Sequence, residues 1–224
     1  MSGPEVNAGA RLNELLQDAG MELLDPETSK RFESYLSLIL RWNGRTNLTS
    51  VRDAEGILVR HFVESIACAR SLPAGIGTLL DFGSGAGFPG LPIALCRPEI
   101  DVTLAESQGK KAAFLQEAVR VIGVHSTVHA GRAEELRAEF DCVTLRAVDK
   151  MAEAVDAARG LVRPGGWLAL LSTGAQLPSL QTAAGAEFAW EPAVLLPGAA
   201  DRIVALGRRA RMSGLRFAPS RGCG

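Results

Sequence analysis

The 224-residue chain is poor in cysteine, histidine and aromatic residues, and it lacks an excess of either charge. Its four cysteines form no Cys-x-x-Cys pair and show no zinc-site spacing to histidine. We therefore expect reduced thiols, two or three of them buried, and no bound metal. The 24 Lys and Arg residues nearly balance the 25 Asp and Glu residues. This balance excludes a uniformly basic nucleic-acid-binding surface but allows a local basic patch.

Long apolar runs are also absent. No segment approaches the roughly 18 apolar residues that a membrane-spanning helix needs. The start of the chain lacks the basic and apolar regions of a signal peptide. We therefore expect a cytoplasmic protein that does not bind membranes. What is present, 47% hydrophobic and 22% charged residues, is the composition of a globular domain.

Residues 1–72 carry the apolar spacing of helices, and no strand pattern interrupts them. Asp25 followed by Pro26 is typical of an N-cap and a first helical position, and Asp53 can cap a later helix. We predict an N-terminal helical module that packs on the rest of the chain.

Between residues 73 and 207, short apolar runs alternate with helical periods. The runs are nearly continuous in hydrophobicity, as in parallel strands that are covered on both faces. This pattern predicts an α/β domain with a doubly wound sheet. The expected strands lie near 78–80, 102–104, 127–128, 142–145, 167–171 and 203–206, and the helices near 90–96, 108–122, 149–162 and 175–184.

Residues 208–224 are expected to form a basic C-terminal tail. The last 24 residues hold a single acid, Asp201. The same stretch contains six arginines, namely Arg202, Arg208, Arg209, Arg211, Arg216 and Arg221. The tail is either a frayed terminus or a contact for phosphate groups.

A glycine-rich loop, DFGSGAGFPG, follows the first predicted strand at the edge where a doubly wound sheet opens its crevice. Glycines in this loop lack a Cβ atom, so the backbone can turn tightly and approach a ligand. Glu106, which ends the next strand, can accept hydrogen bonds from both hydroxyls of a ribose. Together they predict a site for an adenosine-containing cofactor. The expected contacts in the loop are Gly83, Ser84, Gly85, Gly87 and Phe88.

Two cofactors fit this loop. Residues 85–90 match the Gly-x-Gly-x-x-Gly fingerprint of dinucleotide sites, which leaves a nicotinamide-dependent oxidoreductase as an alternative. However, Pro89 and Pro92 remove amide donors from the helix start that would hold a pyrophosphate. S-adenosylmethionine contains no phosphate, so we favour it as the cofactor.

Further motifs occur in order along the chain. They are RWN at 41–43, NLT at 47–49, RHFVES at 60–65, GSGAGFPG at 83–90, SQGKKAAFL at 107–115, RAEE at 132–135 and RAV at 146–148. With this set the chain resembles the bacterial 16S ribosomal RNA guanine-N7 methyltransferases, the glucose-inhibited division protein B family. The resemblance extends from about residue 10 to about residue 207.

The resemblance implies a seven-stranded class I S-adenosylmethionine-dependent methyltransferase fold behind the helical module. It also implies methylation of N7 of a guanine in the decoding region of 16S rRNA, in the 530 loop of the small ribosomal subunit. We further expect a monomer. Among individual residues, Gly83 and Phe88 are implied to line the cofactor site, Glu106 to hold the ribose, and Ala133 and Glu134 to recognise the adenine.

The substrate side of the site is implied to hold four residues: Asn47, Arg60, His61 and Arg146. Because Arg146 follows a buried strand, its charge needs a partner or water. One interpretation is a salt bridge to Asp141 or Glu106. The other is a contact to the methionine carboxylate of the cofactor or to a phosphate, and we favour it.

Methyl transfer to guanine N7 needs positioning more than proton transfer, because N7 offers a lone pair and carries no proton. The sequence lacks the Asn/Asp-Pro-Pro-aromatic motif of amino-group methyltransferases and the Pro-Cys pair of pyrimidine C5 methylation. Among the few aromatic residues, Phe88 and Trp42 are candidates either for stacking on a base or for packing in the core. We favour the core for Trp42.

The chain also departs from the family pattern. It has Glu64 and Glu106 where the family usually has Asp, and residues 169–174 lack the lysine that the family carries there. The missing lysine leaves open a non-catalytic ribosome assembly factor that keeps the fold.

The basic tail offers a compensation for this lysine. Deletion of residues 208–224 is then expected to weaken RNA binding and to reduce its salt dependence. Filter binding at several salt concentrations measures both, and unchanged binding would exclude the idea.

Overall fold

The computed structural model describes residues 7–211. The N-terminal helices are α1 (Ala8–Asp18), α2 (Pro26–Thr46), α3 (Ala54–Ile57), the π-helix η1 (Leu58–Val63) and α4 (Glu64–Ser71). The strands are β1 (Thr78–Phe82), β2 (Asp101–Ala105), β3 (Ser126–His129), β4 (Phe140–Arg146), β5 (Val162–Thr173), β6 (Phe188–Trp190), β7 (Val194–Leu195) and β8 (Arg202–Arg209). The remaining helices are α5 (Gly90–Cys96), α6 (Gly109–Ile122), the short η2 (Ala133–Glu135), α7 (Met151–Arg159) and α8 (Leu177–Ala184).

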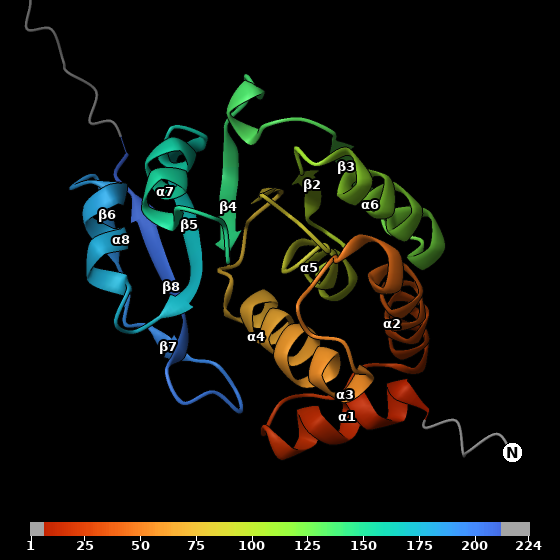
Figure 1. Cartoon of the computed structure of the whole chain (residues 1–224). Coiled ribbons are helices and arrows are strands. Elements are labelled where there is room, and N and C mark those ends of the chain that lie inside the picture. The colour runs from red at the N-terminus through yellow and green to blue at the C-terminus, as the bar shows by residue number, and fades with distance from the viewer. Residues whose placement is uncertain (1–6, 212–224) are drawn as a thin grey trace, which may run out of the picture.

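The strands form one mixed sheet in the order β3-β2-β1-β4-β5-β8-β6 (Figure 1). The first five strands are parallel, whereas β8 runs antiparallel to both β5 and β6. The predicted doubly wound α/β class is confirmed. Within residues 7–211, seven strands lie on the continuous path, and the two-residue β7 adds an eighth that pairs with β8.

Apolar residues that alternate along the strands separate two core layers, one on each face of the sheet. In β1, Leu79 belongs to the layer formed with the N-terminal helices, α5 and α6, whereas Leu80 belongs to the layer formed with α7 and α8. Cys68 and Cys142 are buried in the first layer, and Cys96 is partly buried against it. All three are free thiols, and Cys223 lies outside the described residues.

Two of the N-terminal helices, α2 and α3, begin as the sequence predicts. The Asp25 carboxylate accepts hydrogen bonds from the amides of Glu27 and Thr28, and Asp53 caps α3 through the amide of Gly56. These bonds satisfy amides that have no partner within the helix.

The long helix α2 packs on α6 beside the sheet. Trp42 donates from Nε1 to Glu117 at 2.9 Å, and its ring meets Phe114 edge-on. Trp42 therefore packs between the two parts of the chain, as favoured above.

Several element boundaries differ from the predicted ones. The helix expected near 149–162 ends at Arg159. β5 begins at Val162, five residues before the expected strand, because Val162 pairs with Phe140 of β4. Residues 163–166 then form an irregularity, and regular pairing with β4 resumes between Trp167 and Cys142. β8 continues to Arg209, so Arg208 and Arg209 are strand residues. Residues 212–224, which hold the rest of the expected tail, lie outside the described residues.

In the part of the chain that the structure describes, no helix is long and apolar enough to cross a membrane. The same residues contain no group of three or more His, Cys, Asp or Glu side chains that could hold a metal ion.

Candidate active site

A cavity of about 1120 Å³ opens at the carboxyl ends of the parallel strands. It lies beside β1 and β4, where the strand order reverses and where doubly wound sheets bind their ligands. Small-molecule sites usually span about 300–1,000 Å³, so this cavity has room for a nucleoside and part of a second molecule. Residues of η1, the glycine loop, η2 and the ends of β2, β4 and β5 line it.

The glycine loop forms one wall of the cavity. Gly83, Ser84 and Gly85 line it, and both glycines have positive φ, which side chains rarely adopt. Gly87 also has a positive φ, but it is not among the lining residues. A Cβ atom there would lie 2.6 Å from the Tyr35 hydroxyl, so this glycine is required by packing against α2.

Glu106 connects the glycine loop to the end of β2. It is buried, and its Oε2 accepts from the Gly85 amide at 2.9 Å while its Oε1 accepts from the Gln108 amide at 2.7 Å. Each carboxylate oxygen keeps a further lone pair for a hydroxyl donor. The geometry therefore fits an acid that receives the two hydroxyls of a ribose beside the loop.

Ala133 and Glu134 lie in η2 and also line the cavity. Ala133 is buried, and the Glu134 carboxylate accepts a hydrogen bond from Arg132 at 3.2 Å. Their placement at the same cavity as Glu106 is compatible with recognition of an adenine.

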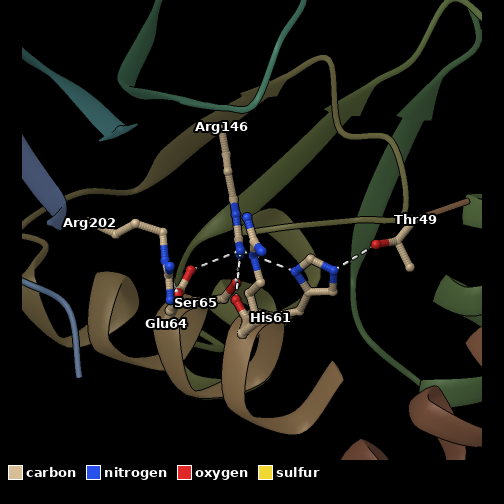
Figure 2. Close-up of polar contacts among 7 residues, drawn as sticks. Thr49, His61, Glu64, Ser65, Arg146 and Arg202 are labelled. Carbon is tan, nitrogen blue, oxygen red and sulfur yellow. Dashed lines mark hydrogen bonds and ion pairs between the residues drawn. The ribbon is translucent and has the colours of Figure 1, made fainter. Parts of the chain in front are cut away.

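Arg146 lies at the end of β4 and is anchored by helix residues rather than by the expected acids (Figure 2). Its Nη2 donates to Glu64 at 2.9 Å and to the Arg60 carbonyl at 2.7 Å, and its Nη1 donates to Ser65 at 3.2 Å. The interpretation of a salt bridge to Asp141 or Glu106 is wrong.

Each of those two acids has other partners. Asp141 pairs with Arg163 and accepts from the amides at the start of β1, and Glu106 accepts from the two amides described above. The partner of Arg146 comes instead from α4, far away in the sequence.

Glu64 bridges two arginines of the cavity (Figure 2). Its side chain is only 2% exposed, and its second oxygen accepts from Arg202 Nε at 2.6 Å. Arg146 is 10% exposed, and burial lowers its pKa from the usual value while the charge of Glu64 opposes this shift. Two guanidinium groups share a single carboxylate, so the cluster has a net positive charge at the cavity.

The π-helix η1 shapes this wall. In a π-helix the wider turn changes the backbone hydrogen-bonding pattern, and such turns often occur at functional sites. Here the Arg60 carbonyl accepts from Arg146, and the exposed Arg60 side chain lines the cavity. The sequence predicts one helix from Asp53 onwards and does not distinguish the π-turn, because its apolar spacing continues through it.

His61 lies between Thr49 and Arg146 (Figure 2). Its Nδ1 is 3.1 Å from Arg146 Nη2, and its Nε2 is 2.7 Å from Thr49 Oγ1. Because a guanidinium can only donate, Nδ1 accepts and Nε2 carries the proton. Burial, together with the charges of Arg146 and Arg60, lowers the pKa of His61 to about 3. The imidazole is therefore neutral, and both of its nitrogens are engaged.

We expect His61 to make stability depend on pH. An unfolded chain protonates this imidazole near pH 6.5, whereas the folded protein keeps it neutral down to about pH 3. The unfolded state binds more protons in that window, so the stabilisation is lost as the pH falls through it. The free energy of unfolding of wild type minus that of His61→Gln should shrink between pH 7 and pH 4 in urea titrations. Asp81, whose pKa burial raises to about 6, is present in both proteins and cancels. A difference that stays constant with pH would contradict the assignment.

Phe88 is the aromatic residue closest to this network. Its ring stacks on His61 with centroids 4.6 Å apart, and the Arg146 guanidinium lies 5.9 Å from its centroid. Only 7% of Phe88 is exposed, and it also packs on Tyr35 and Phe62. Phe88 thus belongs to the core while presenting a small part of its surface to the cavity.

Asn47 is placed differently from the other predicted residues. It ends α2 in the left-handed conformation, and its side-chain oxygen accepts from Arg52 at 2.7 Å. The cavity is lined by its neighbours Leu48 and Thr49 and not by Asn47 itself. Its role in receiving RNA stays a prediction.

Tyr35, which the sequence analysis did not single out, fixes the glycine loop from α2. The buried hydroxyl donates to the Ala86 carbonyl at 2.5 Å. We expect Tyr35→Phe to destabilise the fold by about 1–3 kcal/mol, because a buried carbonyl loses its partner. Chemical denaturation measures this change, and calorimetry should show weaker cofactor binding. If Tyr35→Phe leaves the free energy of unfolding unchanged, the glycine loop keeps its conformation without the Tyr35 hydrogen bond.

The sequence does not mark Arg202 or Glu64 as residues of this cavity. In the sequence, Arg202 is one of the C-terminal arginines and Glu64 is a departure from a family motif. The sequence does contain one signal for Glu64, a carboxylate on an apolar helix face. A charge that is buried on such a face requires a partner.

A family model described as GidB, rRNA small subunit methyltransferase G, matches residues 28–188. The chain belongs to this family. The resemblance drawn from the ordered motifs is thereby confirmed.

Several GidB-family relatives are similar over most of the chain. The ribosomal RNA small subunit methyltransferase G of Halorhodospira halophila is 44% identical over 162 residues, which cover 71% of this chain and 76% of that protein. The protein of the same name from Roseiflexus castenholzii is 45% identical over 150 residues, 64% of each chain. The matched segment thus spans slightly less than two thirds of the second relative.

Solved structures share the fold of this GidB-family chain at low sequence identity. A methyltransferase from Pyrococcus furiosus superposes with a TM-score of 0.60 at 12% identity, over 81% of this chain and 99% of that one. TrmN from Thermus thermophilus gives 0.53 at 22% identity, over 67% of this chain and 53% of that one. These similarities show the methyltransferase fold.

Proposed function

We propose that this protein is an S-adenosylmethionine-dependent methyltransferase of small-subunit ribosomal RNA that acts on N7 of a guanine in the 530 loop. The GidB family and the names of its relatives support rRNA methylation. The observation that carries the N7 assignment is His61, whose two nitrogens are both engaged and whose pKa is too low for a general base near neutral pH. The choice of the 530 loop rests on the family resemblance alone.

The residues at the cavity fit this cofactor. Bound there, S-adenosylmethionine supplies an electrophilic methyl group, which the lone pair of guanine N7 can accept without loss of a proton. Glu106, which holds the glycine loop, would accept the ribose hydroxyls, and Ala133 and Glu134 would contact the adenine. Arg146 and Arg202 attract the anionic groups of cofactor and RNA to the cavity.

The chain's own residues then provide position and charge. Glu64 fixes the two guanidinium groups, and the stack of His61 on Phe88 fixes one wall of the cavity. Methyl transfer to N7 requires no proton transfer. Orientation of the two reactants can therefore supply much of the rate acceleration. Arg60 and Asn47, at and beside the mouth, are proposed to receive the RNA.

The structure at the start of α5 argues against a nicotinamide dinucleotide as the cofactor. The Gly90 amide donates to the buried Asp81 carboxylate at 3.2 Å, and a Cβ at Gly90 would lie 2.7 Å from the same oxygen. This helix start is therefore occupied by an acid, where a dinucleotide would place its pyrophosphate.

The proposed function is tested by transfer of a tritiated methyl group from S-adenosylmethionine to small subunits from a strain that lacks this protein. Digestion of the RNA and chromatography of the bases identify the product. We expect label in 7-methylguanine of 16S rRNA. Label in another base would overturn the N7 assignment. Cofactor and subunit binding without any label would favour a non-catalytic assembly factor.

A further inference from the structure

A second hollow lies at the end of β8 opposite the cavity. It is lined by Ala189, Arg208, Arg209, Ala210 and Arg211, and we refer to it as the arginine hollow. No acidic side chain is among these lining residues. Arg202, at the start of β8, lines the active-site cavity, so the eight-residue strand separates the two sites by roughly 25 Å at about 3.3 Å per residue.

Strand pairing and packing hold the arginines of this hollow in place. Arg208 lies opposite both Trp167 of β5 and Ala189 of β6, and its guanidinium is 5.5 Å from the centroid of the Trp167 ring. The Arg211 side chain packs over Gly165. A Cβ atom added at Gly165 would lie 3.1 Å from Cγ of Arg211. Packing of the arginine stems reduces the entropy that would be lost when their charged ends bind a ligand.

Only part of this positive charge is neutralised. Arg209 donates to the Val162 carbonyl and lies 4.0 Å from Glu139. Within residues 7–211, Arg208 and Arg211 form no salt bridge, and both are exposed. In the sequence, residues 212–224 contain two more arginines and no Asp or Glu.

We propose that the arginine hollow binds backbone phosphates of the RNA substrate, at a segment distinct from the one that enters the cavity. Guanidinium groups match phosphate oxygens in pairs, and the small Ala189 and Ala210 leave room for a phosphate to approach. Because the hollow is on the order of 25 Å from the cavity, it contacts the RNA fold rather than the target nucleotide. The inference rests on the proposed action on rRNA.

The test is the salt dependence of binding to naked 16S rRNA by full-length wild type and by Arg208→Gln/Arg211→Gln. Two lost phosphate contacts should reduce the slope of log K against log salt by about 1.5 and weaken binding by about 30-fold at 0.1 M salt. KM for RNA should rise, whereas S-adenosylmethionine affinity and thermal stability should not change. The charge-preserving Arg208→Lys/Arg211→Lys should recover most of the slope, which a purely structural role would not predict.

Arg31→Gln/Arg120→Gln is the matched control. These arginines are on α2 and α6 and line neither the cavity nor the hollow, and the pair removes the same charge. A double variant of the hollow that binds rRNA like this control overturns the proposal. Normal binding to naked rRNA with weaker binding to assembled subunits also overturns it and assigns the hollow to a ribosomal protein. If wild type itself neither binds nor methylates rRNA, the proposed function fails instead.

Discussion

Glu64→Gln is expected to cost about 3–5 kcal/mol in the free energy of unfolding and to abolish most methyl transfer. The carboxylate is almost fully buried between Arg146 and Arg202, at 2.9 and 2.6 Å. Glutamine keeps the shape but removes the charge, and it leaves two guanidinium groups facing each other without an anion. Urea denaturation measures the stability, and methylation of small subunits measures the activity.

Glu14→Gln provides the comparison for this change. Glu14 pairs with Arg11 at 2.8 Å, but its side chain is 62% exposed, so solvent screens the pair. Its stability and activity should remain close to wild type. If Glu64→Gln proves equally mild, Arg146 and Arg202 hold their positions without the acid, and the buried charge cluster is not what organises the cavity.

Glu106→Ala is expected to weaken S-adenosylmethionine binding by about 100-fold or more, since hydrogen bonds to a charged group contribute about 1.5–3 kcal/mol each. The substitution removes the two proposed ribose contacts. It also frees the amides of Gly85 and Gln108, so the glycine loop loses its connection to β2. Isothermal titration calorimetry gives the affinity directly.

Glu106→Asp separates the two effects. An aspartate keeps the charge and the acceptors but is one methylene shorter, so it should retain much more affinity than alanine. A Glu106→Ala protein that binds S-adenosylmethionine like wild type would show that the ribose is held elsewhere in the cavity.

The contacts of Glu64 with Arg146 and Arg202 could not be predicted from the sequence. The position of Glu106 beside the glycine loop could. Glu106 was predictable because parallel strands end at the same edge of a sheet, which brings the end of β2 beside the loop after β1. Glu64 lies on a helix face whose spacing shows only that the helix is amphipathic. Its two partners are 82 and 138 residues away in the sequence.

Local patterns in the sequence thus determined the helical module, the α/β class, the glycine loop and the acid beside it. Each of these follows from short-range effects: helix capping, strand hydrophobicity and the lack of a Cβ at glycine. The tertiary structure alone decided that Arg146 pairs with Glu64, that η1 is a π-helix, and that arginines surround a hollow at the far end of β8. The reason is that these features depend on long-range packing. Several sequence positions could supply a partner for a buried charge, and only the packing of α4 and β8 against the end of β4 selects among them.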